Sequence, residues 1–109
     1  MKKFIKKNTW LTRKVGIDFG WGNGYVLIPK GHKLHGKHYD EINVDVHGGL
    51  TFSQLVDDEM AKKWKLDMED VDSWCAGFDT CHYGDTIHKW TKSKVDAETT
   101  LLLNNLKQI

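Results

Sequence analysis

KVDAETTLLLNNLKQI, residues 94–109, decides the fold class, because its apolar positions recur at the spacing of an amphipathic α-helix. Ser93 is the expected N-cap, and Asp96 and Glu98 fall in the expected first turn, where the helix dipole favours acids. The apolar stripe has six members: Val95, Thr99, Leu102, Leu103, Leu106 and Ile109. A stripe on one side predicts a C-terminal helix packed on one face of a sheet.

The sheet is expected from stretches upstream of that helix that alternate or are continuously apolar. INVDVH, residues 42–47, alternates most cleanly, and residues 50–52 are expected to resume an extended segment. Residues 20–23, GWGN, have the composition of a hairpin turn. The other predicted strands are residues 12–19, 24–28 and 73–78. This order predicts an α+β fold with a mainly antiparallel sheet of about four to five strands.

A short helix is predicted over residues 57–66, with Met60, Ala61 and Trp64 as its apolar stripe. Residues 67–72 read as a turn and residues 80–88 as a loop. Residues 1–9 are basic and are either frayed or a short edge element. No linker divides the chain, so residues 1–109 are expected to form one domain.

Composition narrows the functional classes. The 109 residues are 39% hydrophobic and 28% charged, with a net charge of +1, and Arg13 is the only arginine. Extended nucleic-acid binding is therefore not expected, since it usually needs a basic excess and arginine. Cys75 and Cys81 are too few for a secreted disulfide scaffold, and no apolar run reaches transmembrane length. We expect a cytoplasmic protein with free thiols and no membrane partner; the oligomeric state stays open.

HGGLTF, residues 47–52, is the first segment that could carry chemistry. His47 is a candidate general acid or base at the end of the predicted 42–47 strand. The backbone of Gly48 and Gly49 can approach a ligand closely, and Thr51 adds a hydroxyl, so the segment could hold a phosphate. The alternative is a strand that ends in a Gly-Gly bulge with a half-exposed histidine.

GFDTCHYGD, residues 77–85, is the second segment. Asp79, His82 and Asp85 recur every three residues, and these side chains suit a divalent metal or an aspartate that orients a catalytic histidine. Cys81 could act as a nucleophile or a soft ligand. The alternative is purely structural, with Asp79 capping a turn and the histidine bonded to a carbonyl group.

Convergence of the two segments is the central structural prediction. If the strand ending at His47 lies beside the strand ending at Phe78, then His47 meets Asp79, His82 and Asp85 at one sheet edge. The aromatic and imidazole side chains expected to contact a ligand there are Trp74, Trp90, Tyr83 and His32.

The succession GYVLIPKGH, YDEINVDVHGGLTF and WCAGFDTCHYGD resembles a family of small uncharacterised proteins of phages and prophages, over residues 24–109. The matching motifs are GYV, P-x-GH, HGGLT and GFD-x-x-H-x-GD. The chain departs from that pattern at Lys33 and in its longer charged stretch, residues 57–72. The resemblance implies a phage protein in the host cytoplasm, in which a counter-defence role is expected by analogy, but it implies no reaction.

Three functions remain open at this point. The first is a hydrolase of a nucleotide or other phosphoester, with His82 or His47 as acid or base, Asp79 as orienter or ligand, and the Gly48 and Gly49 amides stabilising an oxyanion. A divalent metal held by Asp79, His82 and Asp85 would assist it. The second is a non-catalytic binder that sequesters a host nucleotide signal or blocks a host defence protein. The third is an interaction module whose motifs are scaffold.

Overall fold

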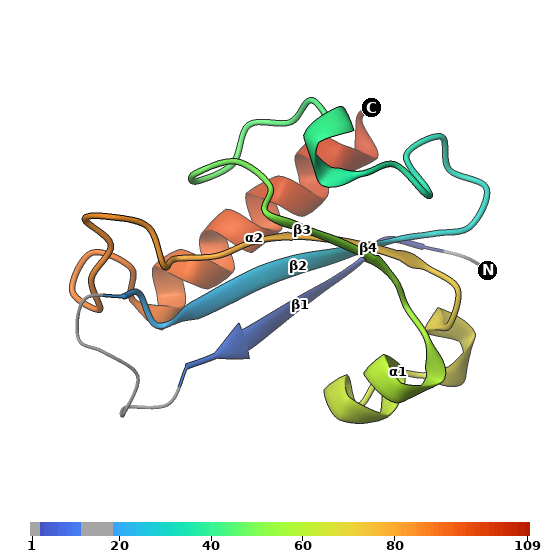
Figure 1. Cartoon of the computed structure of the whole chain (residues 1–109), viewed down its shortest axis with the longest axis horizontal. Helices are drawn as coiled ribbons and strands as arrows, with labels where there is room; N and C mark the ends of the chain where they lie inside the picture. Colours follow the sequence, from blue (N-terminus) through green and yellow to red (C-terminus); the bar gives the residue numbers. More distant parts are fainter. Residues whose placement is uncertain (1–2, 12–18) are drawn as a thin grey trace.

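A four-stranded antiparallel sheet forms the centre of the computed structural model, which describes residues 3–11 and 19–109 (Figure 1). The strands lie in the order β1-β2-β4-β3, and each neighbouring pair is antiparallel. The elements are β1 (Ile5–Trp10), β2 (Gly22–Ile28), β3 (Phe52–Leu55), α1 (Asp58–Trp64), β4 (Trp74–Phe78) and α2 (Lys92–Lys107). The predicted α+β class, with a C-terminal helix and a short helix between the two motifs, is confirmed.

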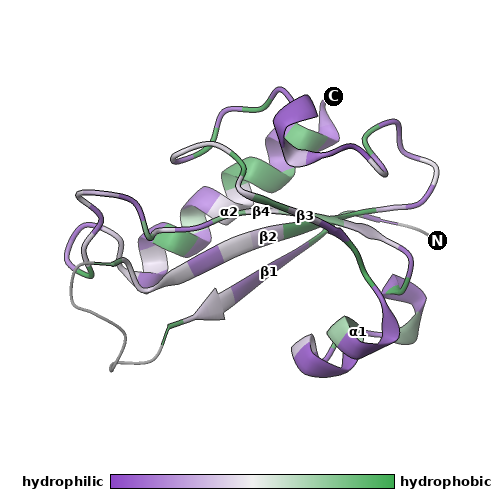
Figure 2. Ribbon diagram, in the orientation of Figure 1, coloured by the Kyte–Doolittle hydropathy of each residue, from purple (hydrophilic) through white to green (hydrophobic). Residues whose placement is uncertain are grey.

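The two central strands separate two apolar layers, because successive side chains of a strand point to opposite faces. Val26 of β2 and Phe78 of β4 belong to the larger cluster, which includes the buried face of α2. Leu27 and Cys75, which pair with each other across β2 and β4, belong to a second cluster with Met60 of α1. The apolar residues of α2 recur from turn to turn in Figure 2. The helices therefore cover opposite faces of the sheet.

α1 begins where the sequence predicts it. The side chain of Asp57 accepts a hydrogen bond from the Met60 amide, and the helix ends at Lys65 in the left-handed conformation. Its Met60 and Ala61 are buried, as expected from the apolar stripe. Within residues 3–11 and 19–109, no helix has the length and apolar content that crossing a membrane requires.

α2 begins earlier than predicted. Thr91, not Ser93, is the N-cap, and its side chain accepts from the Lys94 amide. Asp96 and Glu98 consequently lie beyond the first turn. Both acids serve tertiary contacts instead: Asp96 accepts from Lys6 on β1, and Glu98 reaches the loop that carries the first motif.

The prediction of a strand over residues 42–47 is wrong. The alternation is real, since Ile42 and Val46 are buried and Val44 packs against the same cluster. However, β2 and β3 pair with the two edges of β4, and residues 42–47 form a loop over the apolar layer. The alternation of apolar residues therefore indicated which side chains are buried, but it did not indicate that the segment pairs as a strand.

The predicted hairpin around residues 20–23 is also wrong. Gly22 and Asn23 open β2, whose outer partner is β1. Of the two alternatives for residues 1–9, the edge element is the one observed, because Ile5–Trp10 forms the edge strand. The predicted strand over residues 12–19 falls, apart from its last residue, outside the described residues. The predictions for β4 and for the loop after it are confirmed.

Candidate functional site

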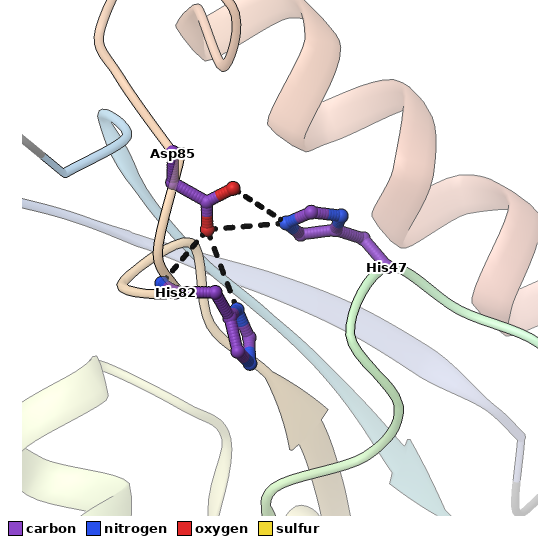
Figure 3. Close-up of side chains that lie close together, drawn as sticks. All are labelled: His47, His82 and Asp85. Carbon is purple, nitrogen blue, oxygen red and sulfur yellow. Dashed lines mark hydrogen bonds and ion pairs between the residues drawn. The ribbon is translucent and has the colours of Figure 1, made fainter.

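Two loops meet at the end of β4 and bring the two motifs together. One loop leaves β4 after Phe78 and continues to α2; the other passes over the core and enters β3. Burial of Ile42 and Val46 fixes the second loop and directs His47 towards the first. Figure 3 shows His47, His82 and Asp85 pointing towards one another.

Asp85 is the centre of this His–Asp cluster, which we define as His47, Asp79, His82 and Asp85. Its carboxylate oxygens lie 2.9 and 3.1 Å from Nε2 of His47. Its Oδ2 also accepts from the His82 amide at 2.9 Å and lies 3.3 Å from His82 Nδ1. Asp85 is only 4% exposed, so its charge is held in place by these contacts.

Asp79 extends the cluster towards β3. Its Oδ1 lies 3.4 Å from His82 Nδ1 and accepts from the Cys81 amide at 3.0 Å. Its Oδ2 accepts from the Thr51 hydroxyl at 3.0 Å. About one third of the Asp79 side chain is exposed, so this carboxylate is the accessible acid of the cluster.

Residues outside the cluster hold the imidazole rings of His47 and His82 in place. The Trp90 ring packs on His47 with centroids 4.1 Å apart, and Glu98 Oε2 accepts from the His47 amide at 2.8 Å. His82 lies over Gly48, where a Cβ atom would come within 2.5 Å of the imidazole ring. Gly48 also has φ +68°, so both its conformation and its lack of a side chain are needed here.

The electrostatics favour a charged Asp85 and a neutral Cys81. Burial opposes ionisation of Asp85, but hydrogen bonds from the His82 amide and the His47 ring outweigh it and lower the pKa of this carboxyl. For Cys81, burial of the sulfur and the charges of Asp79 and Asp85 raise the pKa of the thiol. A thiolate nucleophile at Cys81 is therefore disfavoured.

The donor set fits a divalent metal ion. One ligand atom from each of His47, His82 and Asp85 lies within 4.8 Å of the others. Ligand atoms about 2.1 Å from a tetrahedral zinc ion are about 3.4 Å apart; the His82–Asp85 pair, at 3.3 Å, is close to that spacing, and the His47–Asp85 pair, at 2.9 Å, needs a small outward shift. Imidazole nitrogen and carboxylate oxygen are ligands that zinc and related metals accept. The ion would thus take His47, which the sequence did not assign to the metal.

Several predicted ligand contacts lie elsewhere. Trp74 is at the opposite end of β4, where its indole donates to the Lys37 carbonyl, and His32 packs on Phe4. Tyr83 is fully exposed beside the cluster. Neither side chain therefore contacts a ligand at the cluster: Trp74 is near the second motif in sequence but not in space, and His32 belongs to the separate GH segment.

One amide of the predicted oxyanion pair is already bonded within the protein. The Gly49 amide donates to the Val46 carbonyl at 2.8 Å and so closes a turn instead of facing a ligand. The Thr51 hydroxyl, predicted to contact a ligand, donates to Asp79 and so lies inside the network. Glu98 is the contributor that sequence reasoning did not assign to the site, because nothing near residue 98 marks a contact with a loop 51 residues away.

Comparison of the chain with protein-family models, curated proteins and solved structures finds no match. The side chains of the site are therefore the basis for the proposed function.

Proposed function

We propose that the protein is a metal-dependent hydrolase of phosphate esters such as nucleotides. The observation that carries the proposal is the convergence of His47, His82 and Asp85 on one point from two distant segments. A divalent ion held there would polarise a phosphoryl oxygen and activate water.

The geometry suits the two histidines to metal binding and Asp79 to proton transfer. If Nε2 of His47 and Nδ1 of His82 bind the ion, those nitrogens are not available to exchange protons. Asp79 is then the group suited to accept a proton, because it is accessible and lies beside His82. Thr51 orients this carboxylate through its hydroxyl hydrogen bond. This reassigns acid–base work from the histidines, where the sequence put it, to Asp79.

One lysine adds positive charge on the Trp90 side of the cluster, which suits an anionic substrate. Lys94 Nζ lies 5.0 Å from the centre of the Trp90 ring, and the same ring packs on His47. Positive charge near the site raises the local concentration of phosphate compounds.

The test is metal binding followed by turnover. Protein stripped with a chelator is titrated with Co²⁺, whose visible absorption reports imidazole and carboxylate coordination, and is then assayed with bis(p-nitrophenyl) phosphate and with nucleotides. We expect His82→Ala and Asp85→Asn to lose the cobalt spectrum and the turnover. His32→Ala, a histidine packed on Phe4 away from the cluster, is the matched control. A wild-type protein that gives no cobalt spectrum refutes the metal site.

A non-catalytic binder is the second candidate. It is favoured by the Gly49 amide, which is bonded to Val46 and so cannot stabilise a developing oxyanion. This protein would hold a nucleotide or a host protein without turnover, a role compatible with the phage context that the motifs suggest. Ligand binding that is lost in Asp79→Ala, with no product from the wild type, would support it.

A further inference from the structure

A groove on the sheet face opposite α2 plays no part in the proposed function. It has a volume of about 490 Å³ and lies between α1 and the strands. This volume is within the range of pockets that hold small molecules. The residues that matter for its chemistry are Tyr25, Phe52, Trp64, Gln54, Glu59 and Lys63.

Aromatic rings form the floor of the groove. Tyr25 and Trp64 are 4.6 Å apart between ring centroids, and Tyr25 and Phe52 are 5.5 Å apart with their planes at 80°. Tyr25 lies directly on Gly77 of β4, where a Cβ atom would collide with its ring. The rings touch one another instead of surrounding a void, so the floor suits a flat ligand better than a round cation.

The groove adjoins the His–Asp cluster. Phe52 follows Thr51, whose hydroxyl donates to Asp79. Gly77, beneath Tyr25, is two residues before Asp79, which directly follows the last residue of β4, a separation of about 7 Å at about 3.3 Å per residue. Burial raises the pKa of Tyr25, and the charge of Asp79 contributes in the same direction, as expected for neighbours. A single ligand could therefore span the floor and the cluster.

We infer that the groove binds the base of a nucleotide whose phosphate lies at the His–Asp cluster. A base is flat and stacks on aromatic side chains, which is worth about 1–3 kcal/mol per base. Gln54 and Glu59 line the same groove and can pair with the donors and acceptors on a base edge. The placement of the phosphate rests on the proposed function, whereas the base site does not.

Binding of nucleosides, which lack phosphate, tests the base site by itself. Adenosine, guanosine, cytidine and uridine are titrated into the full chain, and the indole N–H resonance of Trp64 is followed by NMR. We expect this resonance to shift with at least one nucleoside. We expect Trp64→Leu, followed by isothermal titration calorimetry because it lacks the Trp64 resonance, to weaken binding about 5-fold or more, the lower end of the stacking range. Trp10→Leu is the matched control, because Trp10 is exposed and lies near Lys92 of α2 instead of in the groove.

Glu59→Gln provides a second variant on an exposed helix position that should not disturb folding. We expect it to change the preference among the four nucleosides. The base site is overturned if no nucleoside shifts the Trp64 resonance, or if tetramethylammonium shifts it and the nucleosides do not.

The outcomes separate this inference from the proposed hydrolysis. Nucleoside binding without turnover of any phosphate ester would keep the base site and overturn the hydrolase. Equal KM values for a nucleoside monophosphate and ribose 5-phosphate, both unchanged in Trp64→Leu, would keep the hydrolase and overturn the base site.

Discussion

Replacing Gly48 by alanine should damage the His–Asp cluster, whereas the same change at Gly49 should not. Both glycines have left-handed backbones, with φ +68° and +78°. Each alanine therefore costs about 1–2 kcal/mol of stability, which a small domain can tolerate. At Gly49 a Cβ atom meets nothing within 4 Å, so strain is the whole effect.

The difference between the two variants lies in His82. At Gly48 the new Cβ atom would be 2.5 Å from the imidazole, and ordinary contact begins at 3.4 Å, so the ring must move by about 0.9 Å. A movement of this size can lengthen the distance from Nδ1 to Asp85 Oδ2 from 3.3 Å to as much as about 4.2 Å, which is beyond hydrogen-bond range. Misplacement of about 1 Å in a catalytic group can reduce the rate about 100-fold.

Cobalt absorption, turnover of phosphate esters and urea denaturation separate these effects. We expect similar unfolding midpoints for Gly48→Ala and Gly49→Ala, but loss of metal affinity and turnover in Gly48→Ala alone. Equal losses in both variants would mean that loop strain, and not the position of His82, controls the site. Full metal affinity in Gly48→Ala would refute the steric reasoning.

Three further predictions concern residues around the His–Asp cluster, namely Asp96, Thr91 and Cys81. The pKa of Asp96 is lowered chiefly by its hydrogen bond from Lys6, so its stabilising effect is present above the usual carboxyl pKa of 3.8 and is lost as pH falls through the folded value. The gap in urea midpoint between wild type and Asp96→Asn should therefore be full at neutral pH and narrow progressively as pH falls below 3.8. Thr91→Ala should cost about 1 kcal/mol in urea denaturation as an N-cap loss, and Ser93→Ala should cost less. Cys81→Ser should retain turnover in the phosphoester assay, because the raised pKa keeps this thiol neutral.

The elements that sequence predicted well are those whose own side chains decide their structure. α2 has a long apolar stripe, and the core positions Val95, Leu102 and Leu106 are fully buried as predicted. β4 is a short apolar run, and α1 has a capping aspartate at residue 57 before its stripe. In each case the local signals, namely apolar pattern, burial and, for α1, the cap, indicate the same element.

The wrong predictions concern strand pairing, which the sequence of one segment does not determine by itself. Residues 42–47 have the alternation of a strand, yet both edges of β4 are taken by other segments. β1, with its lysines, lacks a strong apolar alternation, and it forms a strand because the free edge of β2 offers hydrogen bonds. Pairing partners depend on the whole sheet, so tertiary context overrides the local pattern.

The convergence of the two motifs was nevertheless predictable, although the strand argument behind it was wrong. What places His47 is the burial of Ile42 and Val46, which holds the loop against the core whether or not it pairs with a strand. The loop after β4 starts at Phe78, so its first polar residues lie at the same end of the sheet as His47. Side-chain support was not predictable in this way, because the contacts of Glu98 and Trp90 depend on where α2 crosses the loop. A motif can thus indicate which residues meet, while the packing that orients them is visible only in the folded chain.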